Sequence, residues 1–315
     1  MISRCKNNSA TVEPFRVHIL GCGSALPTLR HYASAQVVEV RGKLFLVDCG
    51  EGTQIQLRRS RVRFTKIAAV FISHLHGDHC FGLPGMLSTF GLLGRTAPLA
   101  IYAPKELFAT LNMQLELFCN RLDYEVMMHA VDTHSQLIVY EDRSLTIETI
   151  PLEHRIDCCG YLFREKPILP HIRRDVADFY HIPVSQFGNI KAGAGWTTGE
   201  GEPIAHEMLV TPADKPRSYA YCSDTRYIPS LAKRLKGVST LYHESTYGED
   251  NLLMAQKYYH STARQAAMVA KEAGAKQLIL GHYSSRYDDE TVLLKEAQEV
   301  FENSLLSVEQ TVFEV

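Results

Sequence analysis

The sequence predicts an α/β chain in which two β-sheets pack face to face and helices cover their outer faces. Three observations predict this αββα sandwich. Short apolar segments rich in β-branched and aromatic residues recur along the chain, and the first three follow one another as in a meander. Later segments alternate with helical ones, and the whole pattern occurs twice. At 315 residues with 45% hydrophobic content, the chain can bury one large core or two smaller ones.

Predicted strands fall into an early and a late group. Runs of β-branched and aromatic residues predict strands at residues 15–20, 35–40, 43–47, 67–73, 99–102, 137–140, 145–150 and 159–163. Turn-forming stretches around residues 21–27 and 41–42 separate the first three, so we expect these three strands to be neighbours in one sheet. The late strands are expected at residues 218–221, 239–243 and 277–280.

Helices are predicted at residues 51–59, 78–93, 105–119, 228–236, 261–273 and 289–303, the last three alternating with the late strands. A stretch rich in proline and glycine, about 165–205, interrupts this pattern. We interpret it as an insertion in a single domain that spans residues 1–315, because long irregular segments in compact domains are usually functional. A disordered surface loop is the alternative.

Composition limits the classes of function. A formal net charge of -2 argues against attraction of nucleic acid by the whole surface, so any RNA binding must come from a local basic patch with a metal site. No apolar run approaches the roughly 20 residues of a membrane span, and the N-terminal residues lack the apolar region of a secretory signal. We therefore expect a cytoplasmic protein.

The cysteines are expected to be reduced. Eight of them form no CxxC pair and no framework spacing: Cys5, Cys22, Cys49, Cys80, Cys119, Cys158, Cys159 and Cys222. Cys80 follows His79 directly and Cys222 lies two residues before Asp224, so thiolate ligation of a metal has to be weighed. Small buried apolar residues are the favoured interpretation, because enough histidine and aspartate ligands are already present.

The segment from His74 to His79, which reads His-Leu-His-Gly-Asp-His, is the most informative part of the sequence. On an extended chain His74 and His76 point to the same side, so both can reach one ion. Asp78 and His79 then project from the start of a helix and can reach a second ion. Neutral imidazole and ionised carboxylate suit zinc. Four such groups within six positions favour two metal half-sites over an incidental cluster.

Three further residues can complete these half-sites. His154, Asp224 and His282 each follow the end of a predicted apolar strand. Loops at strand ends converge into a site in a layered α/β fold. Taken singly, each of the three could be an ordinary loop residue.

With these residues in this order, the sequence resembles the metallo-β-lactamase superfamily over nearly its whole length. The resemblance implies a four-layer αββα metallo-β-lactamase sandwich with two Zn²⁺ ions per subunit. It implies that one zinc is held by His74, His76 and His154, the other by Asp78, His79 and His282, and that Asp224 bridges both. β-Lactamases of this superfamily often use a cysteine in the second site, whereas Asp224 fits the hydrolase and nuclease pattern better.

Further motifs resemble the ribonuclease Z family (tRNase Z, short form): LGCGSALPT at residues 20–28, DCGEGT at 48–53, GLPG at 82–85, HEST at 243–246 and HST at 260–262. The resemblance implies a zinc-dependent endoribonuclease that removes the 3′ trailer from precursor tRNA and leaves a 3′-hydroxyl on the tRNA. Its catalytic residues would be Asp78, which orients the attacking water, and Glu244 and His260, which deliver a proton to the departing oxygen. Alone, His260 before an N-capping Ser261 would be incidental.

The insertion falls where this family carries a protruding arm that grips the tRNA body, and short-form relatives act as homodimers, so the resemblance also implies a homodimer. Acidic residues balance the basic residues of this segment, so a strongly basic clamp is not evident. A clearer basic patch consists of Arg58, Arg59, Arg61, Arg63 and Lys66. It could neutralise phosphates near the metals, although a solvated face or a subunit contact explains it equally well. Weaker candidates for holding RNA are Ser284, Ser285, Arg286 and Tyr287.

Three other functions stay open at this point. A small-molecule hydrolase of the same fold, acting on a thioester, lactone, lactam or cyclic nucleotide, would need no arm. A redox protein with iron at the paired site is disfavoured, because no flavin-binding domain follows and the ligand set lacks an extra acid. A binding module without chemistry is disfavoured by the complete ligand set.

Overall fold

The computed structural model describes residues 13–119 and 122–315, and its contacts divide the chain into two compact units. The larger unit comprises residues 13–164 and 217–315, and the described part of the smaller unit is residues 165–216. Among the described residues, no helix combines the length and the apolar character needed to cross a membrane.

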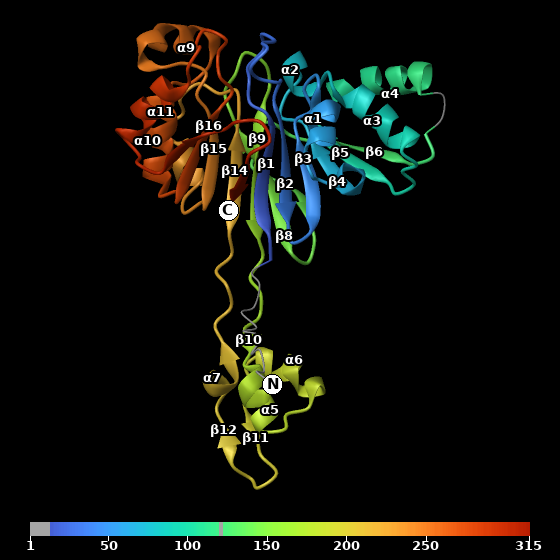
Figure 1. Ribbon diagram of the computed structural model, residues 1–315, viewed down its shortest axis with the longest axis vertical. Helices are drawn as coiled ribbons and strands as arrows, with labels where there is room; N and C mark the ends of the chain where they lie inside the picture. Colours follow the sequence, from blue (N-terminus) through green and yellow to red (C-terminus); the bar gives the residue numbers. More distant parts are fainter. Residues whose placement is uncertain (1–12, 120–121) are drawn as a thin grey trace, which may run out of the picture. The chain divides into compact units, whose positions relative to one another are not determined.

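Two seven-stranded sheets form the centre of the larger unit (Figure 1). The first has the order β18-β1-β2-β3-β4-β5-β6. Its strands are β1 (Phe15–Gly21), β2 (Ala35–Val40), β3 (Lys43–Val47), β4 (Ile67–Phe71), β5 (Leu99–Ala103), β6 (Val126–Ala130) and β18 (Val312–Glu314). The second has the order β17-β16-β15-β14-β9-β8-β7. Its strands are β7 (Ile138–Glu141), β8 (Leu145–Pro151), β9 (Cys159–Glu165), β14 (Ser218–Cys222), β15 (Thr240–Glu244), β16 (Gln277–Gly281) and β17 (Ser304–Leu306).

Strand direction follows the predicted pattern in both sheets. The pairs β1–β2 and β2–β3 are antiparallel, as expected for a meander, and the pairs from β3 to β6 are parallel. In the second sheet β14, β15, β16 and β17 are parallel, and β9 lies antiparallel to β14. Parallel neighbours place their carboxyl ends at one edge of each sheet, and loops that leave this edge can build a common site.

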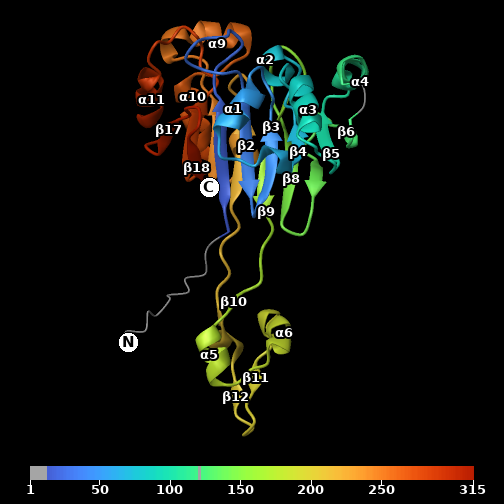
Figure 2. The ribbon, with the colours of Figure 1, turned by 45° about the vertical axis from the view of Figure 1, so that its right-hand side comes forward.

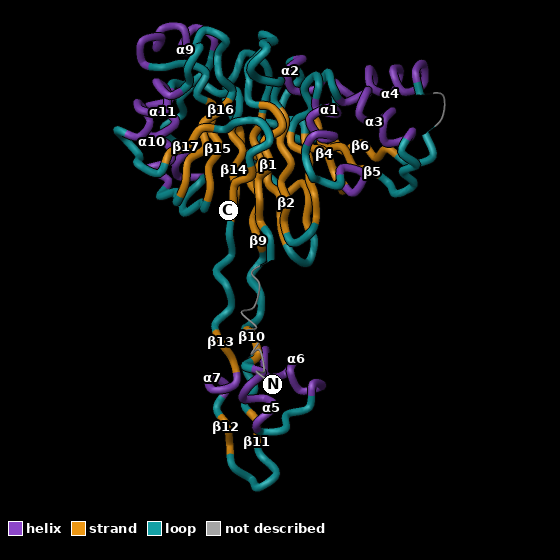
Figure 3. The backbone as a smooth tube through the Cα atoms, viewed as in Figure 1, coloured by secondary structure: helices purple, strands orange, loops and turns teal. Residues whose placement is uncertain are grey.

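Helices cover the outer faces of the sheets, as Figures 2 and 3 show. The first sheet is covered by α1 (Thr53–Arg59), α3 (Leu83–Leu92) and α4 (Glu106–Phe118). The second is covered by α8 (Leu231–Arg234), α10 (Ala263–Ala273) and α11 (Thr291–Gln298). The remaining helices of this unit are α2 (Gly77–Cys80), α9 (Leu252–Tyr258), and the 3₁₀ turns η1 (Phe64–Lys66) and η3 (Glu249–Asn251).

Aromatic side chains fill the space between the two sheets. The ring of Phe163 from the second sheet lies 5.9 Å from the ring of Phe45 and 5.9 Å from the ring of Phe71, both from the first sheet. All three side chains are fully buried, as large aromatic residues at the centre of a sheet sandwich should be. The predicted αββα arrangement is therefore confirmed.

Several element boundaries differ from the prediction. The helix expected at residues 78–93 is two helices, α2 and α3, because the chain turns at Gly82, whose N–H donates to the carbonyl oxygen of Cys49. The helix expected at 228–236 is reduced to the short α8. The prediction did not include the edge strands β6, β17 and β18 or the helix α9.

The smaller unit has a core of its own, formed by Ala177, Ile182, Ile190, Ile204 and Leu209. Two small antiparallel pairs join β10 (His171–Ile172) to β13 (Val210–Thr211) and β11 (Trp196–Thr197) to β12 (Pro203–Ile204). Its helices are α5 (Arg174–Phe179), α6 (Phe187–Lys191), α7 (His206–Leu209) and the 3₁₀ turn η2 (Val184–Gln186). The segment rich in proline and glycine is therefore folded around apolar side chains.

Candidate metal centre

Five of the seven expected metal ligands lie in loops that begin where a strand ends. His74 and His76 follow β4, and His154 follows β8. Asp224 follows β14, and His282 directly follows β16. Asp78 and His79 belong to the short helix α2, which begins one residue after His76. The seven residues are separated by up to 208 positions in the sequence, yet their ligand atoms form two adjoining clusters.

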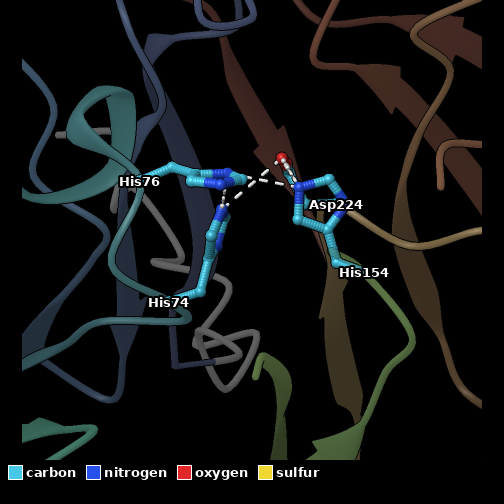
Figure 4. A group of neighbouring side chains, drawn as sticks. All are labelled: His74, His76, His154 and Asp224. Atoms are coloured by element: carbon cyan, nitrogen blue, oxygen red, sulfur yellow. Dashed lines mark hydrogen bonds and ion pairs between the residues drawn. The ribbon is translucent and has the colours of Figure 1, made fainter. Parts of the chain in front are cut away.

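The first cluster consists of His74, His76, His154 and Asp224 (Figure 4). The Nδ1 atom of His76 lies 3.1 Å from Nε2 of His74 and 3.2 Å from Nε2 of His154. Oδ2 of Asp224 lies 3.5 Å from Nε2 of His74 and 3.6 Å from Nε2 of His154. Ligands bound to one tetrahedral zinc ion are separated by about 3.3–3.5 Å, given zinc–ligand distances near 2.0–2.2 Å. The four atoms therefore have the spacing of a metal site.

The second cluster consists of Asp78, His79 and His282 together with the other oxygen of Asp224. Oδ1 of Asp224 lies 3.2 Å from Nε2 of His79 and 3.0 Å from Nε2 of His282. Oδ2 of Asp78 lies 3.3 Å and 3.4 Å from the same two nitrogens. Asp224 thus presents one carboxylate oxygen to each cluster.

Hydrogen bonds fix which ring nitrogen faces the clusters. Nδ1 of His154 lies 2.9 Å from the carbonyl oxygen of Tyr259, which can only accept, so Nδ1 carries the proton. Nδ1 of His282 donates to the Thr246 hydroxyl at 2.9 Å, because that hydroxyl itself donates to Glu244. The Nε2 atoms of both histidines therefore aim their lone pairs at the clusters. Such partners on the distal nitrogen are typical of metal-ligating histidines.

Asp48 is a residue of the site to which the sequence assigned no role. Its Oδ2 accepts hydrogen bonds from Nδ1 of His79 at 2.7 Å, from the Tyr221 hydroxyl at 2.7 Å and from the Ser73 hydroxyl at 2.8 Å. The Ser73 oxygen in turn lies 3.0 Å from Nδ1 of His74. One fully buried carboxylate thereby orients a histidine of each cluster. Its place in the DCGEGT motif was the only signal in the sequence.

The two clusters differ in their electrostatics. In the first, burial lowers the pKa of His74 and His154, and burial together with the charges of His74 and His154 lowers the pKa of His76 to about 4. In the second, burial is outweighed by the carboxylates: Asp224 and Asp78 raise the pKa of His282 to about 10. The charges of Asp78 and Asp224 likewise raise the pKa of His79 above its usual value.

These properties fit bound cations. Nε2 of His79 is buried without a hydrogen-bond partner, although two carboxylate oxygens lie within 3.3 Å of it. A buried polar atom is rarely left unpaired, and a cation shared by this nitrogen and the carboxylates would satisfy all of them. Imidazole nitrogens and carboxylate oxygens are ligands that zinc accepts. The clusters form a metal-binding site.

Three side chains of the site come from backbone in the left-handed region: Asp48 (φ 56°), Asp224 (φ 54°) and His282 (φ 60°). Asp48 and His282 are the first residues after β3 and β16, and Asp224 is the second residue after β14. Positive φ is uncommon outside glycine, although aspartate and histidine tolerate it better than most residues. The turn at each strand end is therefore a conformational cost that places a functional side chain.

Glu244 and His260 form a pair beside the metal clusters. Nδ1 of His260 donates to Oε1 of Glu244 at 2.8 Å, and the Thr246 hydroxyl donates to Oε2 at 2.6 Å. Burial opposes ionisation of Glu244, but the charge and hydrogen bond of His260 hold its pKa below the usual value. Glu244 is fully buried, whereas His260 lines the cavity beside the metal clusters. The two residues therefore occupy different positions relative to a substrate.

The cavity beside the metal clusters has a volume of about 290 Å³ and is lined by His76, Asp78, His154, Asp224 and His282 together with His260. Arg155, Ser284, Ser285 and Arg286 also line it. An adjoining cavity of about 840 Å³ shares Ser24, Ala25, His76, Asp78 and Arg155, and extends to Tyr32 and Phe81. Arg155 was not expected from the sequence. Five of the expected metal ligands thus line a partly basic cavity.

No thiol in the described part of the chain takes part in these clusters. Seven cysteines are free in the described part of the chain, and Cys5 lies outside it. The Cys80 thiol donates to the carbonyl oxygen of His76 at 3.3 Å, and burial raises the pKa of Cys222. Both properties agree with the interpretation of these cysteines as small buried residues.

Curated relatives match nearly the whole chain. The Ribonuclease Z of Bacteroides fragilis is 56% identical over 298 residues, which are 95% of this chain and 98% of that protein. The Ribonuclease Z of Phocaeicola vulgatus is 53% identical over 298 residues, which are 95% of this chain and 96% of that protein. A family model described as Anti-Pycsar protein Apyc1 matches residues 15–167, less than half of the chain.

Solved structures agree with these relatives. The crystal structure of human tRNase Z, short form, covers 95% of this chain and 98% of its own, with 27% sequence identity and a TM-score of 0.68. The metallo-β-lactamase fold protein YhfI from Bacillus subtilis covers 96% of this chain and 100% of its own, with 21% identity and a TM-score of 0.66. The four-layer sandwich is therefore a metallo-β-lactamase fold. Identities above 50% over nearly the full length show that the chain belongs to the ribonuclease Z family.

Proposed function

We propose that this chain is the endoribonuclease that removes the 3′ trailer from precursor tRNA, and that it does so with two Zn²⁺ ions per subunit. The relatives named Ribonuclease Z support the reaction and the substrate. One observation carries the paired metals: the two oxygens of Asp224 face separate sets of three ligands. A carboxylate in that position can bridge two cations. A cytoplasmic location belongs to the same proposal, because precursor tRNA is available there.

The chemistry can be divided among the residues of the site. When bound, a metal pair supplies Lewis acidity that activates water and neutralises charge on the reacting phosphate. Asp78 lines the cavity and can orient the attacking water through its carboxylate. His260 also faces the cavity and can deliver a proton to the departing oxygen from Nε2, since Nδ1 is held by Glu244. Glu244 is fully buried, so we assign it the positioning of His260.

The groove offers contacts for the RNA backbone. Arg155 and Arg286 line the cavity beside the metal clusters, where phosphates next to the cleaved bond would lie. Arg59 adds a positive charge beside the adjoining cavity. Its guanidinium donates to the Tyr32 hydroxyl at 3.2 Å, and Tyr32 lines that cavity. The basic patch defined by Arg58, Arg59, Arg61, Arg63 and Lys66 is exposed. We propose that it neutralises phosphates of the bound RNA.

The reaction is tested by incubating the protein with a precursor tRNA that carries a 3′ trailer. We expect a single cut that yields tRNA with a 3′-hydroxyl and a trailer with a 5′-phosphate. A chelator should abolish the cut, and added Zn²⁺ should restore it. Asp224→Ala should lack activity under all of these conditions. Hydrolysis of small phosphodiesters or esters without cleavage of the precursor tRNA would overturn the proposed substrate while leaving the metal site intact.

The basic patch is tested by its salt dependence. Replacing Arg58 and Arg61 with glutamine should weaken binding of precursor tRNA. The slope of log Kd against log salt should become shallower by about 1 for each phosphate that the variant no longer neutralises. The matched control is Arg143→Gln, a basic residue in the turn between β7 and β8. An unchanged slope in the double variant would assign this patch to solvent or to a subunit contact.

We propose that the unit formed by residues 165–216 serves as the arm that grips the tRNA body, and that the protein is a homodimer. Helix α4 supports a subunit contact, because apolar residues occur on most of its sides although only Leu111 is buried. Met113, Leu117 and Phe118 are 53%, 69% and 77% exposed. Exposed apolar side chains that gather on one element often mark an interface, and in a homodimer a second copy of this chain would cover them.

The subunit contact is tested by light scattering coupled to size exclusion. The native protein should elute as a dimer, and Leu117→Glu should elute as a monomer with unchanged metal content. Leu253→Glu, at a similarly exposed apolar residue of α9, is the control and should remain a dimer. A native protein that is monomeric at micromolar concentration would contradict the proposal.

A further inference from the structure

A separate set of side chains that could ligate a metal lies outside the catalytic clusters. It consists of Cys22, His31 and Glu309, whose ligand atoms lie within 4.8 Å of one another. Cys22 directly follows β1, His31 belongs to the loop between β1 and β2, and Glu309 belongs to the loop between β17 and β18. Two segments that are distant in the sequence therefore bring a thiol, an imidazole and a carboxylate together, and the proposed cleavage of RNA uses none of them.

The distances in this set match those around one small cation. Sγ of Cys22 lies 3.3 Å from Nδ1 of His31 and 3.5 Å from Oε1 of Glu309. Oε2 of Glu309 lies 3.1 Å from the same nitrogen of His31. Ligands on a tetrahedral zinc ion are separated by about 3.3 Å for nitrogen and oxygen and about 3.5 Å for pairs that include sulfur, given zinc–sulfur distances near 2.3 Å. The cluster fits such an ion within a few tenths of an ångström.

The outer partners of this set are also those of a metal site. Nε2 of His31 lies 3.1 Å from Oε1 of Glu290, so a carboxylate holds the ring nitrogen that faces away from the cluster. Metal-ligating histidines nearly always have such a partner. The backbone N–H of Tyr32 donates to Oε1 of Glu309 at 2.9 Å and fixes the orientation of that carboxylate. Arg30 pairs with Glu290 at 2.8 Å and balances its charge.

We propose that Cys22, His31 and Glu309 bind a structural divalent cation of the zinc class, separate from the catalytic pair. The fourth position falls to a water or to the carbonyl oxygen of Ser307, which lies 3.6 Å from the Cys22 sulfur. Cys22 is fully buried, and the side chains of His31 and Glu309 are each only 12% exposed. Thiolate and carboxylate together carry two negative charges, so a divalent cation leaves the buried cluster neutral.

Binding exchanges protons for the metal. The thiol proton of Cys22 and a proton on Nδ1 of His31 are released when sulfur and nitrogen become ligands. Burial raises the pKa of Cys22, and the hydrogen bond to Glu309 raises the pKa of His31. The affinity of this site should increase as pH rises.

The proposed ion would fasten the rim of the catalytic groove. The N–H of Tyr283 donates to the carbonyl oxygen of Cys22 at 2.9 Å, and the N–H of Ser24 donates to the carbonyl oxygen of Tyr283 at 3.0 Å. Tyr283 is adjacent to His282, and Ser24 lines both cavities beside the catalytic clusters. A cation at Cys22 would thus tie this rim to the C-terminal segment that carries Glu309.

Substitution of Co²⁺ for the native metal tests this proposal, because thiolate ligation gives a charge-transfer absorption band in the near ultraviolet. The catalytic clusters contain only histidine and aspartate, so the band reports on Cys22 alone. We expect the native protein to show the band and to bind one metal equivalent more than Cys22→Ala. Cys119→Ala, at a half-buried thiol that ends helix α4, is the matched control and should keep the band.

Two outcomes overturn the proposal. One is a native protein that takes up Co²⁺ but shows no thiolate band, which would mean that the set is a hydrogen-bonded cluster only. The other is a band that persists in Cys22→Ala. If that variant does not fold, Glu309→Gln should still lower the metal content by one equivalent and weaken the band. Cleavage of precursor tRNA is scored separately, so failure of this site and failure of the proposed function remain distinguishable.

Discussion

At the scale of single residues, the site depends on buried carboxylates that each serve several partners. Asp224 presents its two oxygens to different clusters, and Asp48 accepts hydrogen bonds from His79, Tyr221 and Ser73. Neither carboxylate is exposed by more than a few per cent. Burial opposes ionisation of Asp224, but the charges of His282, His79 and His74 hold its pKa below the usual value.

Asp48→Asn tests the orienting role of this carboxylate. An amide of the same size cannot accept all of the hydrogen bonds, so His79 loses its fixed tautomer. We expect metal affinity to fall by about 10–100-fold, as for other outer partners of metal ligands. Competition with a chromophoric chelator measures the change. Asp142→Asn, at an acceptor of several hydrogen bonds near the β7–β8 turn, is the control; equal affinities in the two variants would contradict this role.

Kinetic measurements distinguish the role of His260 from that of Glu244. His260→Ala should lower kcat by about 10²–10⁴-fold, because a proton donor to the departing oxygen is removed. Glu244→Gln should cause a smaller loss and should change the pH profile of kcat, since the imidazole remains but its partner is neutral. Metal content should be unchanged in His260→Ala. A variant His260→Ala that cleaves at the native rate would remove this residue from the mechanism.

The sequence identified the candidate ligand and catalytic residues more readily than the residues that support them. The spacing of His74, His76, Asp78 and His79 determines a local arrangement, so it can be read without a fold. Asp48 and Thr246 act through hydrogen bonds to residues 31 and 36 positions away, respectively, and no local pattern encodes such pairs. The sequence also did not predict the positive φ angles of Asp224 and His282, because neither aspartate nor histidine requires that conformation.

At the scale of elements, close backbone packing holds the metal-binding turn in place. The N–H of Cys49 donates to the carbonyl oxygen of His79 at 2.8 Å, and the N–H of Gly82 donates to that of Cys49 at 2.9 Å. A Cβ at Gly50 would lie 2.2 Å from the carbonyl oxygen of Asp78, and one at Gly82 would lie 2.1 Å from that of Gly50. Glycine at these positions lets the segment after β3 lie directly against α2.

Gly50→Ala tests this packing. The added methyl group must displace the backbone of Asp78, so we expect a loss of about 1–3 kcal/mol in the free energy of unfolding and weaker metal binding. Denaturant unfolding and metal titration measure the two effects. Gly85→Ala is the control, because its new methyl group would meet only the flexible end of Gln54, at 3.2 Å. Equal stability of both variants would argue against a rigid contact here.

Element boundaries show where sequence patterns fail. The apolar periodicity from residue 78 to residue 93 continues across Phe81 and Gly82, yet the helix breaks there because the backbone of Gly82 contacts Cys49 and Gly50. The strand β6 is only partly buried, so its sequence lacks a continuous apolar run. Local patterns therefore located most buried elements and the edge strand β7, but they missed the edge strands β6, β17 and β18 and the break that tertiary contacts impose at Gly82.

At the scale of the whole molecule, the sandwich brings strand ends from distant parts of the chain to one site. The alternation of strands and helices predicted this layered core. The fold of the smaller unit was harder to predict from the sequence, because its core consists of a few apolar side chains on very short elements. Proline and glycine content located it at about 165–205, whereas the compact unit extends to Pro216.

The metal-free protein should lose stability at alkaline pH. Asp224 and Asp78 raise the pKa of His282 to about 10 in the folded chain, against about 6.5 when unfolded. A raised folded-state pKa means that this stabilisation is complete below about pH 6.5 and is lost as pH rises towards about 10. Melting temperatures of chelated protein should fall across this range, whereas zinc-loaded protein should not show this fall, because its histidines are already deprotonated. A flat alkaline profile without metal would contradict the ion-pair assignment.

The central claim is that seven side chains hold two cations with Asp224 between them. Anomalous diffraction at the zinc absorption edge, from crystals of the zinc-loaded protein, tests it most directly. We predict two peaks, one among His74, His76 and His154 and the other among Asp78, His79 and His282, each in contact with a different oxygen of Asp224. A single peak in this region, or peaks that Asp224 does not bridge, would contradict the account.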